Sequence, residues 1–515
     1  MENKDRKVLL QISNLKQYFP VGKRGLAVKA NDGITIDIYE GETFGLVGES
    51  GCGKSTLGRS LLQLYKQTDG RTMYFGRTID EIAPQYAYDT FRHMAKRKEH
   101  MFASRKKFEE FMKEYEALPE KEQYARHGEM TRLRKEANDA MLDLATLVGG
   151  LLVAEDIKPV ADIYMEEYKI SRELRDAMEK RADLQLDVDE IAFKVNKAKE
   201  NGKKANDAAL SKAQEKLKAC DAEIAEINKR IDEVHVRIAK MRANYEGHPD
   251  YATYEAYHSN GIDLARLNYN EMRHLRSDLQ LIFQDPYSSL NPRMTVGQII
   301  GEGMIAHKFY RTNNERMQEE VIRVMDECGL AGYFLHRYPH QFSGGQRQRI
   351  GIARALALRP KFVVCDEAVS ALDVSIQAQI INLLLELKEK QNLTYMFITH
   401  DLSVVKYISD RIGVMYLGNM VELAPADDIF AHPLHPYTEA LLNAIPTTDE
   451  DASRNPEILE GDIPSPVNPP KGCKFHTRCK YCTEICKQVV PELQELRPNH
   501  FVACHHALEN SPKEG

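Results

Sequence analysis

The sequence lacks any run of about 18 or more consecutive apolar residues, which argues against a transmembrane helix. Residues 1–7 are charged and lack the apolar segment of a secretory signal. An excess of positive charge is missing too: the net charge is -7, so bulk electrostatics do not favour binding to nucleic acid or to anionic lipid. We therefore expect a soluble, cytosolic chain, and its 515 residues predict two to four domains.

Cysteine is sparse along most of the chain, because four of the nine cysteines lie singly and the other five lie between Cys473 and Cys504. In a cytosolic chain such a group favours metal binding over disulfides. The tail holds Cys473, Cys479, Cys486 and Cys504, separated by five, six and seventeen residues. Four thiolates can hold zinc or an iron–sulfur cluster, and this spacing matches neither zinc ribbons nor common ferredoxin runs. The spacing alone leaves the metal open, and buried thiols without a metal are the alternative.

A glycine-rich loop with the sequence GESGCGKST follows a buried-looking strand at residues 43–47 and precedes a helix start. It fits the phosphate-binding pattern G-x-x-x-x-G-K-[ST] in the correct structural context. The glycines allow successive N–H groups to turn toward phosphate oxygens at the positive end of the helix. Lys54 would contact the β- and γ-phosphates, and the Ser55 hydroxyl would bind Mg²⁺. The predicted nucleotide-binding residues of the loop are Gly48, Glu49, Ser50, Gly51, Cys52, Gly53, Lys54, Ser55 and Thr56.

Strands alternate with helices from residue 279 to residue 401, which predicts a parallel sheet with helices on both faces. One apolar strand ends in Asp366 and Glu367, and another ends at His400. Because the carboxyl ends of parallel strands share one edge, Asp366 can reach the Mg²⁺ held by Ser55, and Glu367 can face an attacking water. An aromatic near the end of the first strand, Phe19 or alternatively Tyr18, is a candidate for stacking on adenine, although core packing is the commoner role.

Residues 82–267 differ in composition and periodicity from the rest of the chain, since they are rich in charged residues, poor in turn signals and mostly helical in period. Apolar residues recur there at alternating spacings of three and four in two stretches, separated by Asn201 and Gly202. This pattern predicts an antiparallel coiled-coil hairpin with arms of about 30 residues, about 45 Å long. The seams comprise Ile170, Leu174, Ala177, Leu184, Val188, Ile191, Val195 and Ala198, then Leu210, Ala213, Leu217, Cys220, Ile224, Ile227, Ile231, Val234, Ile238 and Met241, and Arg181 is the one charged residue among them.

The order of these motifs resembles the ATP-binding cassette (ABC) ATPases over residues 1–80 and 270–430. The signature Ser343-Gly344-Gly345-Gln346 separates that family from other phosphate-loop proteins. The resemblance implies that two cassettes meet head to tail, so that the signature of one closes on the ATP held by Lys54 of the other. It further implies that Glu367 is the general base, His400 a γ-phosphate contact, Gln284 a Mg²⁺ ligand and water sensor, and Asp373 a contact across the dimer.

Residues 283–294, 370–379 and 435–442 are similar, almost residue for residue, to the ATPase subunits of oligopeptide and dipeptide permeases. This resemblance implies ATP-driven peptide import through two membrane subunits, with an extracytoplasmic binding protein and a second ATPase subunit, more often a different chain than a copy. The chain would then lie at the cytoplasmic face of the plasma membrane. Some relatives carry nickel or other small solutes. The resemblance also favours a [4Fe-4S] cluster on the four tail cysteines, with zinc as the alternative and Cys482 outside the set. His476, His505 and His506 are possible substitute ligands.

We thus predict an α/β fold: an ABC-type P-loop cassette with a parallel or mixed sheet and a helical subdomain, interrupted by the helical hairpin. The expected parts are 1–81 and 268–430 for the cassette, 82–267 for the insertion and 431–515 for a small cysteine-rich C-terminal domain. The family has no counterpart for the insertion, which could dock a partner, select the second ATPase or be a tolerated surface feature; partner docking is favoured.

Two rival functions come from other classes. ATPases of the SMC type also split a cassette with a coiled coil and bind DNA, but their coil follows the position of Gln284, has far longer arms and carries a hinge at its tip. Soluble ABC proteins of translation carry two cassettes per chain, whereas this sequence has one. We therefore expect no nucleic-acid partner.

Overall fold

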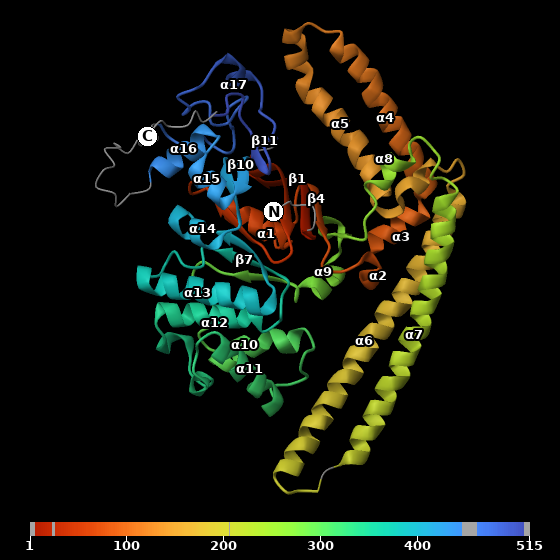
Figure 1. Ribbon diagram of the computed structural model, residues 1–515, viewed down its shortest axis with the longest axis vertical. Coiled ribbons are helices and arrows are strands. Elements are labelled where there is room, and N and C mark those ends of the chain that lie inside the picture. The colour runs from red at the N-terminus through yellow and green to blue at the C-terminus, as the bar shows by residue number, and fades with distance from the viewer. Residues whose placement is uncertain (1–5, 23–25, 205, 445–460, 509–515) are drawn as a thin grey trace. The chain divides into compact units, whose positions relative to one another are not determined.

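The computed structural model describes residues 6–22, 26–204, 206–444 and 461–508. The chain forms two compact units (Figure 1). Unit 1 contains residues 1–74, 263–265 and 273–515, and unit 2 contains residues 75–262 and 266–272. The boundaries expected at residues 82 and 267 therefore lie inside unit 2.

The larger sheet of unit 1 has the strand order β11-β12-β10-β9-β3-β8-β7-β6. Strands β9, β3, β8, β7 and β6 run parallel, while β10, β12 and β11 pair antiparallel, so the sheet is mixed. Every residue of β3, β7 and β8 is buried, as expected for strands covered on both faces. The bounds are β3 (Thr43–Val47), β6 (Leu279–Ile282), β7 (Phe362–Asp366), β8 (Thr394–Ile398), β9 (Arg411–Tyr416), β10 (Asn419–Pro425), β11 (Gln494–Arg497) and β12 (His500–Val502).

A second, four-stranded sheet has the order β2-β1-β4-β5. Its strands are β1 (Val8–Pro20), β2 (Ala27–Tyr39), β4 (Asp69–Tyr74) and β5 (Ile262–Asp263). A clear strand pattern in the sequence covers only residues 8–12 of β1 and residues 34–38 of β2. The antiparallel pairing continues beyond them, through register shifts, to Pro20 opposite Ala27. Cross-strand pairing thus extends both strands through polar segments that lack a clear alternating pattern.

Four helices of unit 1, α10 to α13, pack around one apolar cluster that includes Ile300, Met325 and Ile350. The helical region at residues 297–328 forms two helices, because the chain turns at Lys308, where φ is 59°, and Asn314 caps the next helix. The helices of unit 1 include α1 (Lys54–Leu61), α10 (Val296–Ala306), α11 (Glu315–Glu327), α12 (Gly344–Leu356), α13 (Val374–Gln391), α14 (Leu402–Ile408), α15 (Ala426–Ala431), α16 (Pro436–Asn443) and α17 (Glu484–Gln488), with short 3-10 helices at Gly332–Phe334 and Pro339–Gln341.

The C-terminal segment is part of unit 1, not the separate small domain that the sequence suggested. Strand β12 pairs with β10 and so extends the main sheet. Glu422 on β10 is fully buried and accepts hydrogen bonds from the backbone N–H groups of Leu434 (2.6 Å) and His435 (3.0 Å). Its carboxylate also lies 2.7 Å from Nε2 of the buried His500. This one carboxylate therefore joins both ends of the C-terminal segment to the sheet.

Unit 2 is helical and has its own apolar core, which includes Phe91, Val148, Tyr164 and Ile238. The apolar stretch around residues 147–153 lies within this core. The helices are α2 (Ile79–Ile82), α3 (Gln85–Arg92), α4 (Met94–Glu116), α5 (Glu120–Val148), the 3-10 helix Gly149–Val153, α6 (Lys158–Glu200), α7 (Asp207–Ala243) and α8 (Tyr251–Glu255). The 3-10 helix Leu264–Arg266 and α9 (Tyr269–Leu275) carry the chain back into unit 1.

The two longest helices, α6 with 43 residues and α7 with 37, run side by side (Figure 1). Most of the apolar positions that the sequence singled out on them are buried, among them Leu174, Val188, Ile231 and Val234. The charged residue in the first seam, Arg181, pairs with Asp221 of α7 at 2.6 Å. Further ion pairs across the two helices are Lys180 with Glu223, Arg230 with Glu173 and Arg237 with Glu166.

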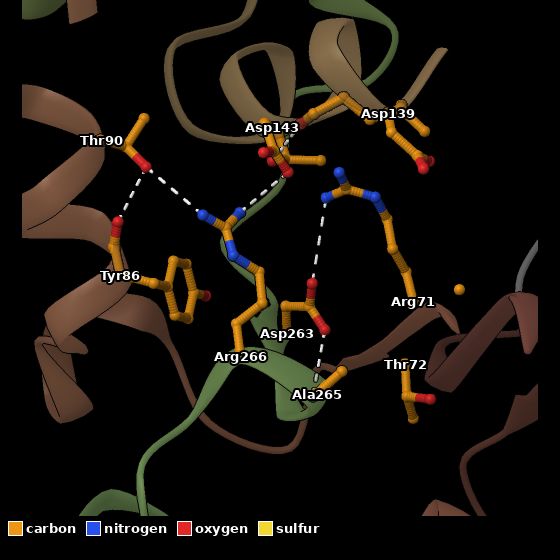
Figure 2. A network of polar contacts seen from close by, with 12 residues as sticks. Arg71, Thr72, Tyr86, Thr90, Asp139, Asp143, Asp263, Ala265 and Arg266 are labelled. Carbon is orange, nitrogen blue, oxygen red and sulfur yellow. Dashed lines mark hydrogen bonds and ion pairs between the residues drawn. The ribbon is translucent and has the colours of Figure 1, made fainter. Parts of the chain in front are cut away.

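Ion pairs also hold residues 263–266, where the chain returns toward unit 1 (Figure 2). Within unit 1, the Asp263 carboxylate lies 3.9 Å from Arg71 and accepts a hydrogen bond from the N–H of Ala265. Within unit 2, Arg266 pairs with Asp143 at 3.1 Å and lies over the ring of Tyr86. Each of these ion pairs therefore fixes a short stretch of the returning chain within one of the two units.

We predict that Glu422→Ala destabilises unit 1 by about 3 kcal/mol or more, because it leaves His500 and two backbone N–H groups buried without their acceptor. Denaturant unfolding and limited proteolysis of the C-terminal segment measure the effect. The control is Glu439→Ala, since Glu439 makes a partly exposed ion pair with Lys480 and accepts a long hydrogen bond from the Tyr481 hydroxyl at 3.5 Å. Equal stability of the two variants would contradict the anchoring role.

Candidate functional site

The loop at residues 48–53 joins β3 to α1 and has three glycines at positive φ: Gly48 at 147°, Gly51 at 80° and Gly53 at 103°. A Cβ on Gly48 would lie 2.2 Å from the carbonyl oxygen of Met415, and one on Gly53 would lie 2.0 Å from that of Ala30. Glycine is therefore required at these two positions by both backbone angle and space. The resulting turn places the start of α1 directly after the loop, as a phosphate-binding site needs.

The Lys54 side chain is folded back onto the loop, where its ammonium donates to the carbonyl oxygens of Gly48 (2.7 Å) and Glu49 (3.1 Å). At the next residue of α1, the Ser55 hydroxyl donates to Asp366 at 2.5 Å. Arg59 pairs with the other oxygen of the same buried carboxylate at 3.1 Å. Sequence reasoning missed Arg59, although its spacing of four from Ser55 places both side chains on one helix face.

Glu367 follows directly after β7, with a φ of 48° that is unusual for a residue with a side chain. Its carboxylate accepts a hydrogen bond from the Gln284 amide at 2.6 Å and lies 3.6 Å from Nδ1 of His400. The structure therefore brings together three residues that follow β6, β7 and β8 at one edge of the sheet. Asp366 and Ser55 lie at the same edge, as the strand order requires.

The signature residues lie on another element, the N-terminus of α12. The Ser343 hydroxyl accepts a hydrogen bond from the Gln346 N–H, and the Gln346 side chain accepts one from the Ser343 N–H, which forms a capping box. Gly345 packs against Ile376, so a Cβ there would lie 2.5 Å from that side chain. Asp373 caps α13 by accepting from the N–H of Ile376. In the described part of the chain, no hydrogen bond or ion pair joins these residues to the phosphate loop.

The two candidate aromatics on β1 differ in their surroundings. Phe19 is half-buried and packs edge-on against Tyr65, with ring centroids 5.3 Å apart. The Tyr18 hydroxyl donates to Asp32, and burial together with this carboxylate raises the pKa of Tyr18 well above its usual value. The Tyr18 hydroxyl is thus already hydrogen-bonded to a protein group, while the apolar ring of Phe19 packs beside Tyr65. The adenine-stacking role of Phe19 stays a prediction.

Two residues of the C-terminal segment contact the phosphate loop, and sequence reasoning found neither. Arg478 forms two hydrogen bonds with the Glu49 carboxylate, at 2.7 and 3.1 Å, and its side chain is 4 % exposed. The Tyr437 hydroxyl accepts a hydrogen bond from the N–H of Glu49 at 2.8 Å. The backbone N–H and the side-chain carboxylate of Glu49 are therefore both bonded to residues nearly 400 or more positions away in the sequence. Only the tertiary structure reveals this, because no local pattern marks either residue.

Four tail cysteines line one small cavity of about 10 Å³: Cys473, Cys479, Cys486 and Cys504. Cys482 is not among the residues lining it, although it forms a C-x-x-C pair with Cys479 that the sequence analysis overlooked. Burial, with nearby thiols adding to it, raises the pKa of Cys473 to about 12 and that of Cys504 to about 11. Without a bound cation these thiols are neutral at physiological pH.

Two observations limit which metal the four cysteines could hold. Among the described residues, these sulfur atoms do not group within the 4.8 Å that joins three ligands of one ion. The nearby histidines have other partners: His476 with the carbonyl of Cys473, His505 with that of Val489, and His506 with the Thr483 hydroxyl. The geometry therefore does not form a ready single-ion zinc site, and each of these histidines is held through one of its two ring nitrogens.

Comparison with known proteins relates the chain to transport ATPases. The family model described as ABC transporter matches residues 31–237 and 249–370, and the one described as oligopeptide/dipeptide transporter, C-terminal region, matches residues 421–486.

No helix in the described residues is both long and apolar enough to cross a membrane.

Three curated relatives illustrate the similarity. The oligopeptide transport ATP-binding protein AppF of Bacillus subtilis is 55% identical over 250 residues, covering 48% of this chain and 75% of AppF. OppF of Salmonella typhimurium, also named an oligopeptide transport ATP-binding protein, is 52% identical over 246 residues, covering 47% of this chain and 73% of OppF. The putative oligopeptide transport ATP-binding protein YkfD of Bacillus subtilis is 36% identical over 508 residues, covering 98% of each chain. This last alignment therefore runs across the insertion.

We predict that Arg478→Ala weakens ATP binding about tenfold, because the bidentate bond that orders Glu49 in the loop is lost. Equilibrium titration with a fluorescent ATP analogue measures affinity, and a KM that rises while kcat changes little identifies a positioning role. Lys480→Ala is the matched control, since that exposed lysine pairs with Glu439. Unchanged affinity in Arg478→Ala would contradict the role assigned to this contact.

Proposed function

Because this chain belongs to the ABC transporter ATP-binding proteins of the oligopeptide/dipeptide permease family, we propose that it powers the uptake of oligopeptides or dipeptides through a membrane permease. It is an ABC-type ATPase, the ATP-hydrolysing subunit of a transporter. The observation that carries the proposal is the meeting of the phosphate loop, Asp366 and the Glu367–Gln284 pair at one edge of the sheet. The printed names of AppF, OppF and YkfD support a peptide cargo.

The residues at the sheet edge fit Mg²⁺, which prefers oxygen ligands. Ser55 and Asp366 already place two oxygens 2.5 Å apart, and Gln284 supplies a third from the next strand end. When bound, the ion neutralises charge on the β- and γ-phosphates. Lys54, released from Gly48 and Glu49, would contact the same phosphates, and Arg59 would keep the Asp366 carboxylate oriented.

Glu367 would act as the general base. A water between its carboxylate and the γ-phosphate would attack phosphorus, lose its proton to Glu367 and displace ADP by cleaving the bond to the bridging oxygen. Gln284 holds the carboxylate in position from one side, and His400 lies near it from the other, where it can contact the γ-phosphate. Both residues also link Glu367 to the strands on either side of β7.

ATP would be enclosed by two cassettes. The N-terminus of α12, whose first-turn N–H groups have no acceptor within the helix itself, is suited to binding phosphate, as is the phosphate loop. Since nothing in the described chain joins Ser343–Gln346 to its own loop, the signature is available for the loop of a second subunit, with Asp373 at the same interface. We propose a different ATPase chain as that subunit. Closure on ATP and opening after hydrolysis would drive the transporter.

The remaining partners follow from the family. Two membrane permease subunits would carry the peptide, and an extracytoplasmic binding protein would deliver it, with this chain peripheral at the cytoplasmic face. The matches do not favour an SMC-like or ribosomal function, and no nucleic-acid partner is proposed. Nickel or another small solute is the alternative cargo.

We propose that Cys473, Cys479, Cys486 and Cys504 hold a [4Fe-4S] cluster with a structural role. They line one cavity, and among the described residues no three of their sulfur atoms lie close enough for a single zinc ion. The cavity of about 10 Å³ would have to widen to take a cluster. When bound, the cluster would keep the thiols deprotonated and fix the segment that carries Arg478 and Tyr437. It would thereby support the contacts to Glu49.

We propose that α6 and α7 form the antiparallel coiled coil that the sequence pattern predicts, and that it docks a partner. The buried apolar seams and the ion pairs across the two helices support the coiled coil. The alignment of YkfD across the insertion supports a role beyond a tolerated surface feature, because the insertion is not peculiar to this chain.

For the ATPase, we predict that Glu367→Gln lowers ATP turnover about 100-fold or more, since the amide cannot accept the proton from water. ATP binding persists, and peptide uptake by cells carrying the variant in place of the wild type is lost. Lys54→Ala, in contrast, loses ATP binding itself. Uptake that persists in Glu367→Gln while turnover is lost would contradict a transport role for the ATPase.

For the cysteines, we predict that anaerobically purified protein contains about four iron and four sulfide per chain, with visible absorption typical of a cluster. Cys486→Ser loses the cluster, because Cys486 is the most buried of the four. The control Cys482→Ser keeps it, since Cys482 does not line the cavity. Bound zinc without iron, or a cluster lost only in the control, would overturn the assignment.

A further inference from the structure

Unit 2 contains a group of metal-binding side chains that the ATPase does not use: Asp80 of α2, Glu167 of α6 and His235 of α7. One ligand atom from each residue lies within 4.8 Å of the others. Nε2 of His235 is 2.7 Å from the Glu167 carboxylate, and Ser171 donates to the Asp80 carboxylate at 3.3 Å. The three residues are far apart in the sequence, so the tertiary fold alone brings them together.

These residues line a cavity of about 260 Å³ within unit 2. Aromatic side chains, including Phe91, Tyr164 and Tyr168, form much of its wall. The Glu167 side chain is 12 % exposed, whereas that of His235 is 47 % exposed. The group therefore lies between the aromatic interior and solvent, where an ion can enter from one side and be partly shielded on the other.

The electrostatics of the group favour a cation. Two carboxylates share a partly buried space with one imidazole, and burial, together with the negative charge of Glu167, raises the pKa of Asp80 to about 6. The one arginine lining the cavity, Arg242, is engaged elsewhere: it bonds to Glu255 at 2.6 Å and to the Tyr164 hydroxyl at 2.8 Å. Its positive charge is thus balanced by Glu255 and does not satisfy Asp80 and Glu167.

We propose that Asp80, Glu167 and His235 form a binding site for a divalent transition-metal cation, with Zn²⁺ as its best probe. One imidazole nitrogen and two carboxylate oxygens are a ligand set that suits Zn²⁺ better than Mg²⁺ or Ca²⁺, which prefer oxygen alone. Three protein ligands leave further coordination positions open toward the cavity, for water or a small anionic ligand. The ion would also join α2 to α6 and α7, and so would connect the first helix of unit 2 to the two longest helices of that unit.

The site is tested on the full chain by titrating Zn²⁺ calorimetrically into protein freed of metal by a chelator. Any Zn²⁺ bound by the tail cysteines is common to all variants, so the difference in stoichiometry reports this site. Wild type is expected to bind one more equivalent than Glu167→Gln and His235→Gln. The matched control is Glu166→Gln, whose residue neighbours Glu167 but pairs with the exposed Arg237, and it is expected to behave as wild type.

Thermal unfolding supplies a second measurement, because an ion that binds only the folded state raises the unfolding temperature. Zn²⁺ should raise it in wild type and Glu166→Gln and leave it lower in the two ligand variants. If Glu167→Gln loses helix content, the exposed His235→Gln decides alone. Equal stoichiometry in wild type and His235→Gln would overturn the site and would identify the group as an ion pair between a protonated histidine and two carboxylates.

Discussion

The nucleotide site depends on a single buried carboxylate. Asp366 ends β7 and is 1 % exposed, and its carboxylate accepts hydrogen bonds from Ser55 and Arg59 of α1. These two contacts fix the face of α1, and hence the phosphate loop before it, against the strand that also carries Glu367. A buried carboxylate needs hydrogen-bond partners, and both of these partners come from one helix face. The position of the loop therefore depends on the contacts to Asp366.

The C-terminal segment also supports the phosphate loop, through contacts to Glu49. Glu422 binds this segment to β10, and Arg478 and Tyr437 carry the connection onward to Glu49. The segment is consequently part of the cassette's structure and not an appendage. Two of the tail cysteines, Cys473 and Cys479, lie close to Arg478 in the sequence.

The insertion is tolerated because of where the chain leaves and returns. It departs after β4 and comes back at β5, which are neighbours in the same sheet, so its ends are close together. Joining two close points by a long segment costs little conformational entropy beyond that of a short loop. The inserted unit also buries its own core, including Val148 and Ile238.

The sequence by itself determined the features that arise from local pattern: the phosphate loop, the acidic end of β7, the long helices α6 and α7 and most of their buried positions. These are set by glycine angles, strand ends and helical periodicity over neighbouring residues. Only the tertiary structure decided the contacts Arg478–Glu49 and Glu422–His500, the continuation of the main sheet into the C-terminal segment, and the meeting of Asp80, Glu167 and His235. Each joins residues far apart in the chain, and no local periodicity encodes which distant side chains the packing of strands and helices will bring together.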